Sequence, residues 1–137
     1  MTYHSILRSY WYVACLSREL RRRPLARTVM GQHLVLFRDR SGQPAALEDR
    51  CPHRNAPLSK GCVHHEHLTC PYHGWQFDRS GMCRLIPGRT GNVGLSAHCV
   101  PAYPVIEQQP FVWVQPTPGT IPSMPPPLHH QVALPGY

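Results

Sequence analysis

The sequence has no long hydrophobic run. A helix that crosses a bilayer needs about 20 consecutive, mostly apolar residues, so we expect neither a membrane span nor a membrane partner. The first residues also lack the apolar stretch of a secretory signal peptide. The six cysteines are scattered rather than set at the spacings of a disulfide framework. Together these absences predict a cytoplasmic protein with reduced thiols.

Acidic residues and lysine are scarce. Seven Asp and Glu stand against 14 Lys and Arg, which gives a net charge of +7 with neutral histidines. Five arginines cluster near the N-terminus: Arg18, Arg21, Arg22, Arg23 and Arg27. Because no recognised nucleic-acid-binding motif accompanies them, we expect no nucleic-acid partner and interpret the cluster as a solvated face. An acidic protein surface, such as that of a reductase, is the alternative partner.

The 3.6-residue apolar period of a long helix is also missing. Short apolar stretches alternate with turn signals, which predicts an all-β fold of antiparallel strands around one core. The expected strands are Tyr10–Ala14, Ala26–Met30, His33–Arg38, Ala45–Asp49, Leu68–Thr69, Gln76–Asp78, Val105–Glu107 and Phe111–Gln115. Tight turns are expected at 30–32, 40–42 and 79–81, and short helical segments at Ser17–Leu20 and Ala56–Lys60.

Residues 116–137 are rich in proline, which disfavours both helix and sheet. The prolines of this segment are Pro116, Pro118, Pro122, Pro125, Pro126, Pro127 and Pro135. We therefore expect one domain over residues 1–115, followed by an extended tail or linker.

Two short motifs carry the most information. Cys51-Pro52-His53 is followed, after residues 54–69, by Cys70-Pro71-Tyr72-His73. Each motif combines one thiol with one imidazole. A [2Fe–2S] cluster of the Rieske type is held by two thiolates on one iron and two imidazoles on the other. We therefore predict Cys51 and Cys70 on one iron and His53 and His73 on its neighbour.

A structural zinc site is the alternative interpretation of four such ligands. Zinc fingers place the cysteines together in one pair and the histidines together in the other, whereas both pairs are mixed here. The iron–sulfur interpretation is therefore favoured, and a zinc-stabilised interaction module without catalysis is kept as one functional hypothesis. A disulfide between Cys51 and Cys70 would leave both histidines unexplained.

The residues beside the ligands suit a stiff metal-binding site. Pro52 and Pro71 restrict φ next to each cysteine, and Gly61 and Gly74 allow close approach of the backbone. Amides near Gly74 could donate hydrogen bonds to cluster sulfurs. Three larger residues would either tune and shield the cluster or pack between the loops: Arg54, Tyr72 and Trp75.

These motifs resemble the Rieske domain of the ring-hydroxylating oxygenases. The resemblance covers the run from Cys51 to Gly61, the run from Cys70 to Phe77 and the start Tyr10-Trp11-Tyr12-Val13-Ala14, within about residues 8–115. It implies an antiparallel β-sandwich with a small inserted subdomain, at about residues 50–80, that carries the cluster at its tip. The start favours the oxygenase N-terminal domain over the carrier ferredoxins, within the branch that acts on methoxyarenes and similar compounds.

The sequence differs from the Rieske proteins of respiratory complexes. Those proteins carry an additional, bridged cysteine in each loop, where this chain has Ala56 and Tyr72. They also place a serine hydroxyl near the cluster, where this chain has Trp75. Because hydrogen bonds to the sulfurs raise the potential, we expect a reduction potential near the bottom of the Rieske range, at roughly −150 mV.

The resemblance implies one-electron transfer from a reductase or ferredoxin donor to an oxygenase catalytic domain or subunit. In the family, that domain holds a mononuclear iron on two histidines and a carboxylate. Residues 116–137 offer no such set, because His129 and His130 are adjacent and no acid follows them. We expect the Rieske part of a terminal oxygenase without catalytic residues of its own. A free-standing Rieske ferredoxin is the alternative.

Two further groups have no assigned role. The run His64-His65-Glu66-His67 is interpreted as an exposed turn rather than a second metal site, because adjacent side chains on an extended chain point apart. A disulfide between Cys62 and Cys83 is not favoured, and Cys15 and Cys99 show no pattern.

Overall fold

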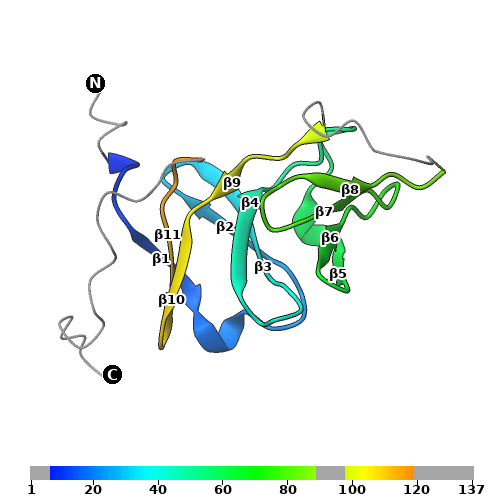
Figure 1. Cartoon of the computed structure of the whole chain (residues 1–137). Helices are drawn as coiled ribbons and strands as arrows, with labels where there is room; N and C mark the ends of the chain where they lie inside the picture. Colours follow the sequence, from blue (N-terminus) through cyan, green and yellow to red (C-terminus); the bar gives the residue numbers. More distant parts are fainter. Residues whose placement is uncertain (1–6, 89–97, 119–137) are drawn as a thin grey trace.

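The computed structural model describes residues 7–88 and 98–118. Within them, the chain forms three antiparallel sheets and two short 3-10 helices, which confirms the all-β fold (Figure 1). No helix in these residues is long and apolar enough to cross a bilayer.

Two of the sheets form the base of the molecule, on the left in Figure 1. The first has the order β1-β11-β10 and brings both ends of the domain together: β1 (Tyr12–Leu16), β10 (Val105–Gln108) and β11 (Phe111–Val114). The second has the order β2-β3-β4-β9: β2 (Leu25–Val29), β3 (Gln32–Arg38), β4 (Pro44–Glu48) and β9 (Ala102–Tyr103). Helix η1 (Ser17–Glu19) connects β1 to β2.

The third sheet is inserted between β4 and β9 and lies on the right in Figure 1. Its order is β5-β6-β7-β8: β5 (Cys62–His64), β6 (His67–Thr69), β7 (Gln76–Phe77) and β8 (Cys83–Leu85), preceded by helix η2 (Leu58–Lys60). We call this sheet and η2 the insert. The insert extends beyond position 80, because the turn after Asp78 returns the chain to pair β8 with β7.

Strand β3 is buried on both of its faces. Leu34 and Leu36 belong to the core between the two base sheets, whereas Val35 and Phe37 belong to a second core shared with the insert. All four side chains are 0% exposed, and burial of each contributes about 1.5–3 kcal/mol. Since both faces are covered, the strand is a continuous apolar run rather than an alternating one.

In two of the predicted turns, an aspartate carboxylate accepts hydrogen bonds from backbone N–H groups of the turn. Asp39 Oδ1 accepts hydrogen bonds from the N–H groups two and four residues later, at 2.9 and 3.0 Å. Asp78 Oδ1 accepts the equivalent bonds at 2.9 and 3.1 Å. The third turn joins β2 to β3 through Met30 and Gly31, with φ of 49° and 78°. Such a left-handed pair is what a two-residue hairpin needs, and all three turns are confirmed.

The structure adds three short strands that the sequence did not predict, namely β5, β8 and β9. Each has two or three residues, so its local apolar signal is weak and only pairing with a neighbour defines it. Strand β1 begins at Tyr12 rather than Tyr10 and continues past a bulge between Val13 and Cys15. The two short helical segments are confirmed as 3-10 turns.

Arg38, the last residue of β3, forms hydrogen bonds with β10 and with the segment around η1. Its guanidinium donates hydrogen bonds to the carboxylate of Glu107 on β10 at 2.6 and 2.9 Å. It also donates to the carbonyls of Leu20 at 2.6 Å and Ser17 at 3.1 Å. The hydrogen-bonded Arg38 holds the pKa of Glu107 below its ordinary value, so the pair stays ionised at neutral pH and fixes β10 against the end of β3.

Gly61 allows the start of β5 to approach β6. A Cβ at this position would lie 1.9 Å from the carbonyl oxygen of Thr69. Gly61→Ala should therefore displace the backbone beside Cys70 and destabilise the domain by about 1–3 kcal/mol, as overpacking does. Thermal unfolding should show this loss, and metal analysis should show less iron per chain.

Gly42→Ala is the control for this substitution. Its φ is +86°, but nothing lies within 4 Å of a Cβ there. The variant should carry only the left-handed strain of about 1–2 kcal/mol and keep its full iron content. Equal iron contents in the two variants would contradict the role of Gly61.

Candidate metal centre

The two predicted ligand loops share one backbone design. The N–H of Cys51 donates to the carbonyl of Ala56 at 2.8 Å, and the N–H of Asn55 donates back to the Cys51 carbonyl at 2.7 Å. In the second loop, the N–H of Cys70 binds the carbonyl five residues later at 2.8 Å, and Gly74 donates back at 3.2 Å. The fourth residue after each cysteine is left-handed, with φ of 59° at Asn55 and 73° at Gly74. The C-x-H and C-x-x-H motifs therefore occupy equivalent loops.

The thiols lie on the buried side of the site. Cys51 is 1% exposed and Cys70 is 4% exposed, and both belong to the core that joins β3 to the insert. Burial raises the pKa of the Cys51 thiol to about 11; the N–H of His53 opposes this shift, and the adjacent Cys70 thiol adds to it. Two neighbouring buried thiols become thiolates together only when a cation binds them.

The imidazoles lie on the solvent side of the same site. His53 and His73 are both exposed, and their ring centroids are 4.9 Å apart with planes inclined by 70°. Desolvation lowers the pKa of His53, and the neighbouring His73 and Arg54 lower it further. This shift favours the neutral ring, which is the form that binds metals.

The predicted donors occupy two sides of the site, with the thiols buried and the imidazoles exposed. Among residues 7–88 and 98–118, no group of three or more His, Cys, Asp or Glu side chains that could hold a metal ion is found. A Rieske cluster separates a thiolate-bound iron from an imidazole-bound iron, whereas a tetrahedral zinc needs its donors around one point.

The Trp75 ring lies against the ring of His53. Its ring stacks on the His53 imidazole, with centroids 4.7 Å apart and planes 14° apart, and the side chain is 9% exposed. The sequence analysis missed His98, whose ring meets Trp75 at 5.1 Å and 87°; no motif surrounds His98 that could have indicated this contact. The Trp75 side chain thus contacts the predicted ligand His53 and also packs in the core.

Tyr72 and Arg54 border the exposed imidazoles. Tyr72 is 72% exposed and its ring centroid lies 6.3 Å from that of His73, while Arg54 is also exposed. This exposure does not fit packing between the loops. The amide of Gly74 binds the Cys70 carbonyl, whereas the N–H groups that act on the Cys51 sulfur are those of His53 and Arg54.

A carboxylate closes the first ligand loop. Asp49 accepts hydrogen bonds from the N–H of Ser59 at 2.7 Å and from its hydroxyl at 2.6 Å. The loop that carries Cys51 and His53 lies between these two residues, so the pair fixes its two ends together. The sequence analysis missed this pair, because a single Asp and a distant Ser form no recognisable motif.

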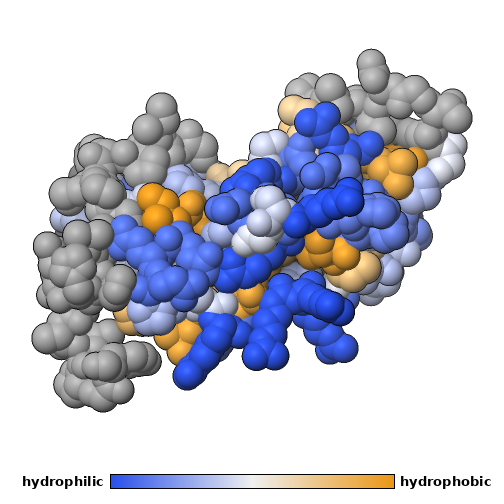
Figure 2. Space-filling view, turned by 60° about the horizontal axis from the view of Figure 1, so that its bottom comes forward, coloured by the Kyte–Doolittle hydropathy of each residue, from blue (hydrophilic) through white to orange (hydrophobic). Residues whose placement is uncertain are grey.

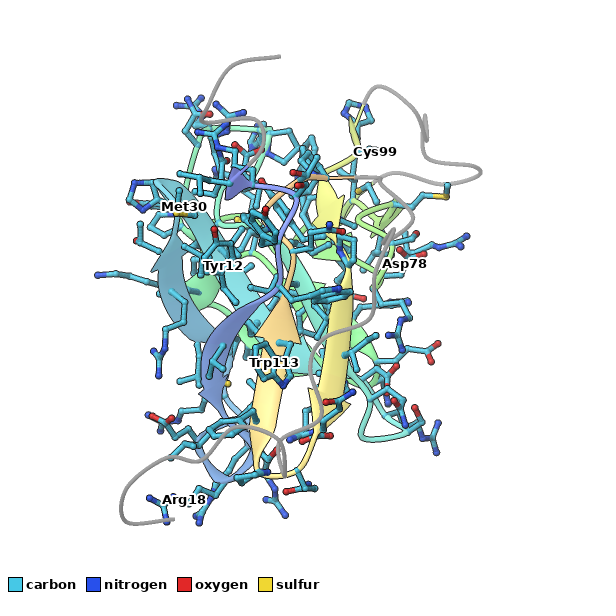
Figure 3. The ribbon with its side chains drawn as sticks, turned by 90° about the vertical axis from the view of Figure 1, so that its left-hand side faces the viewer. Tyr12, Arg18, Met30, Asp78, Cys99 and Trp113 are labelled. Carbon is cyan, nitrogen blue, oxygen red and sulfur yellow. The ribbon has the colours of Figure 1, made fainter. Side chains whose placement is uncertain are left out.

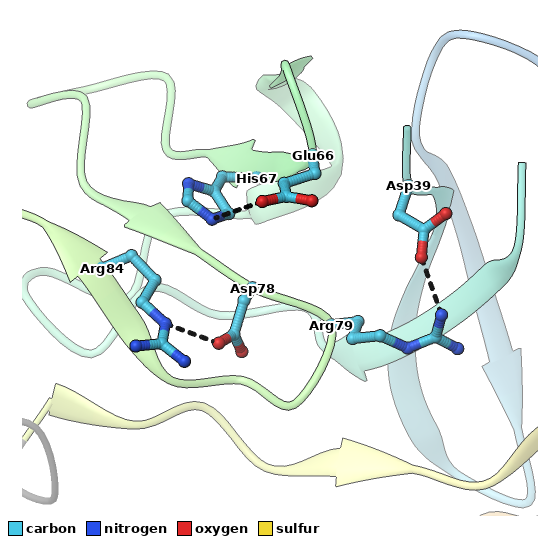
Figure 4. A pocket seen from close by; sticks show the side chains of 6 residues that line it. All are labelled: Asp39, Glu66, His67, Asp78, Arg79 and Arg84. Atoms are coloured by element: carbon cyan, nitrogen blue, oxygen red, sulfur yellow. Dashed lines mark hydrogen bonds and ion pairs between the residues drawn. The ribbon is translucent and has the colours of Figure 1, made fainter. Parts of the chain in front are cut away.

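A charged hollow of about 410 Å³ lies where the insert meets the turn between β3 and β4 (Figure 4). It is lined by Asp39, Glu66, His67, Asp78, Arg79 and Arg84. Arg79 donates to Asp39 at 2.7 Å and to the carbonyl of Pro44 at 3.0 Å, and Arg84 pairs with Asp78 at 2.7 Å. Because these groups pair with one another, we interpret the hollow as a contact that holds the insert on the base.

The arginine cluster is largely solvated, as the sequence predicts. Arg21, Arg22 and Arg23 follow η1 and are exposed, and Arg27 pairs with Glu19 at 3.2 Å. Figure 2, which turns the bottom of Figure 1 toward the viewer, shows mainly hydrophilic side chains on this face.

The histidine run forms the hairpin between β5 and β6. His65, with φ of 57°, and Glu66 make the turn, and His64 pairs with His67 across it. The expected exposed turn is therefore confirmed. The rings of His64 and His65 nevertheless lie 4.4 Å apart, because the left-handed residue removes the alternation of an extended chain. Cys62 and Cys83 do not form a disulfide.

Comparison with known proteins identifies the same region. The family model of the Rieske [2Fe-2S] domain matches residues 10–104. The chain is 43% identical over 125 residues to the oxygenase component of dicamba O-demethylase from Stenotrophomonas maltophilia, covering 87% of this chain and 37% of that protein. It is 40% identical over 106 residues to the vanillate O-demethylase oxygenase subunit of Pseudomonas sp. (strain HR199 / DSM 7063), covering 77% and 29%.

Solved structures agree with these matches. Dicamba monooxygenase with non-heme iron and dicamba has a TM-score of 0.78 at 41% identity, covering 88% of this chain and 36% of that chain. NdmA of Pseudomonas putida CBB5 has a TM-score of 0.77 at 32% identity, covering 83% and 36%. The chain thus spans about a third of the length of these relatives.

The matched residues contain both ligand loops and the strands that carry them. Fold, donor set and sequence similarity agree with one another: the chain belongs to the Rieske [2Fe–2S] domain family of oxygenase components and binds a Rieske [2Fe–2S] cluster.

Proposed function

We propose that this chain is the electron-transferring Rieske part of a terminal oxygenase. Four residues would hold the cluster: Cys51, Cys70, His53 and His73. The observation that carries the proposal is the division of the site into thiols at most 4% exposed and imidazoles that face solvent. The bound cluster supplies storage for one electron.

The exposed imidazole edge is where a redox partner would make contact. His53 and His73 lie at the surface beside Arg54 and Tyr72, so a docked protein reaches these rings without any opening of the fold. The buried thiols keep the other side of the site away from water. Electron exchange is therefore expected through the histidine side only.

The names of the relatives support a choice of redox partners for this chain. Dicamba O-demethylase and vanillate O-demethylase are named as oxygenase components or subunits, which supports a reductase or ferredoxin as donor and a mononuclear iron domain as acceptor. Their names also support a system that removes methyl groups from aromatic methyl ethers. A place in the cytoplasm is supported by the scattered cysteines of the sequence, which lack the spacings of a disulfide framework.

Substitution of one ligand from each pair tests the assignment. Cys70→Ser and His73→Ala should each abolish the native cluster and lower the melting temperature, because metal binding is coupled to folding. Iron and acid-labile sulfide analysis would measure the loss. Cys62→Ser and His64→Ala are matched controls at exposed positions outside the loops and should keep both elements. If Cys70→Ser or His73→Ala leaves the electron paramagnetic resonance spectrum unchanged, the substituted residue is not a ligand of the cluster.

The side chain at position 75 should set part of the reduction potential. We expect roughly −150 mV for the native chain, at the low end of the Rieske range. Trp75→Ser places a hydroxyl near the sulfurs, and one hydrogen bond of about 1 kcal/mol raises the potential by roughly 40 mV. Trp75→Ala opens the same space without a hydroxyl. Equal potentials in the Ser and Ala variants, measured by redox titration, would refute this tuning.

Reconstituted electron transfer tests the function as a whole. The purified chain is mixed with a reductase alone, and then with the same reductase together with a separate oxygenase, so that product formation has a source of electrons. We expect reduction by the reductase but no product until the chain is joined to a catalytic iron domain. Product formation by the unjoined chain would instead identify a free-standing carrier, and failure to accept any electron would refute both functions.

A further inference from the structure

Two neighbouring hollows lie among the exposed arginines that follow η1. Their volumes are about 400 and 560 Å³, and both are lined by Arg21 and Arg22. The first also takes Arg40 from the turn between β3 and β4, and the second takes Arg23. We call these hollows, with their four arginines, the arginine groove. Both the turn and η1 lie at the lower edge of Figure 1, which Figure 2 turns toward the viewer, and Arg18 of η1 is labelled at the bottom of Figure 3.

The carboxylates of the chain are already bound elsewhere. All seven Asp and Glu side chains lie within residues 7–88 and 98–118. Five of them pair with an arginine outside the groove, one lies 3.9 Å from a histidine ring, and one accepts hydrogen bonds from a serine. Two of the seven line the groove, but Glu19 pairs with Arg27 at 3.2 Å and Asp39 pairs with Arg79 at 2.7 Å.

The arginines of the groove have no such counter-charge. Arg21, Arg22, Arg23 and Arg40 are all exposed, and within the part of the chain that the structure describes none of them forms an ion pair. Like charges that line one concave surface add their fields and attract negative groups to it. The surplus positive charge of the chain is therefore concentrated at a site that is shaped to receive a ligand.

The lining of the groove favours a carboxylate-rich peptide as this ligand. A guanidinium presents a planar fork of N–H donors that matches a carboxylate with two parallel hydrogen bonds. Between the arginines, the half-buried side chains of Val63 and Leu25 also line the hollows. These apolar groups suit the methylene groups of glutamate side chains, which a small inorganic anion lacks.

The groove and the imidazole edge lie at opposite ends of the β5–β6 hairpin. At one end Cys62 pairs with Thr69, directly before the ligand Cys70. At the other end is the turn of the hairpin, where His65 lines the groove. A peptide that is bound in the groove therefore does not lie over the ligand loops.

We propose that the arginine groove binds an acidic, glutamate- or aspartate-rich segment of a partner protein. The guanidinium groups of Arg21, Arg22 and Arg40 pair with its carboxylates, and Leu25 and Val63 contact its methylene groups. A partner that is held in this way leaves the imidazole edge free for electron exchange. The binding itself depends neither on the cluster nor on the proposed electron-transfer function.

Fluorescence anisotropy of a fluorescein-labelled oligoglutamate peptide, titrated with the full chain, tests this surface. The native chain should bind the peptide saturably, and added salt should weaken the binding because exposed ion pairs are screened. Substitution of both Arg22→Gln and Arg40→Gln should raise the Kd about tenfold. Arg22→Lys with Arg40→Lys should recover part of this loss, since lysine keeps the charge without the planar fork.

Lys60→Gln is the matched control for Arg22→Gln. Each change removes one positive charge from an exposed side chain that forms no ion pair in the described residues, so both variants should keep the native melting temperature. Lys60 does not line the groove. Arg22→Gln should raise the Kd about threefold, whereas Lys60→Gln should leave it unchanged.

Two results would overturn the proposal. Equal weakening by Lys60→Gln and Arg22→Gln would show that the peptide responds only to the net charge of the chain. Saturable binding of inorganic tripolyphosphate that depends on Arg22 and Arg40, without any binding of the peptide, would show that the groove takes a small phosphate compound instead of an acidic protein segment.

Discussion

The burial of two cysteine thiols inside a hydrophobic core is the constraint on which the rest of the structure depends. Cys51 and Cys70 are members of the core that joins the insert to β3, whereas the two histidines of the same loops face solvent. The loops must therefore hold the charged cluster with its thiolate side buried in the core and its imidazole side in contact with solvent. Their matching hydrogen bonds and left-handed residues at Asn55 and Gly74 hold the two loops in that arrangement.

The two base sheets hold the insert in place. Because β3 faces one core with Leu34 and Leu36 and the other with Val35 and Phe37, the insert cannot move without disturbing the sandwich. The Arg79–Asp39 contact holds the insert at the turn between β3 and β4. A redox domain benefits from such rigidity, since electron transfer requires little rearrangement of the ligands.

The sequence predicts the parts of the site that are local in the chain. The ligand motifs, the three tight turns and the close approach at Gly61 depend on neighbouring residues, and each leaves a readable pattern. The Asp49–Ser59 pair, the His98–Trp75 contact and the pairing of β9 with β4 join residues that are farther apart in the chain. Strands β5 and β8 pair within local hairpins, but each has only three residues and so leaves a weak apolar signal. No pattern of residue types marks these contacts, so sequence reasoning does not find them.

The central claim is that thiolates hold one iron and imidazoles hold the other. Pulsed electron paramagnetic resonance of the reduced protein, labelled with ¹⁵N only in histidine, tests it most directly. The account predicts a rhombic signal with strong coupling to two histidine nitrogens. Coupling to fewer than two, or a protein that contains zinc and gives no signal, would contradict it.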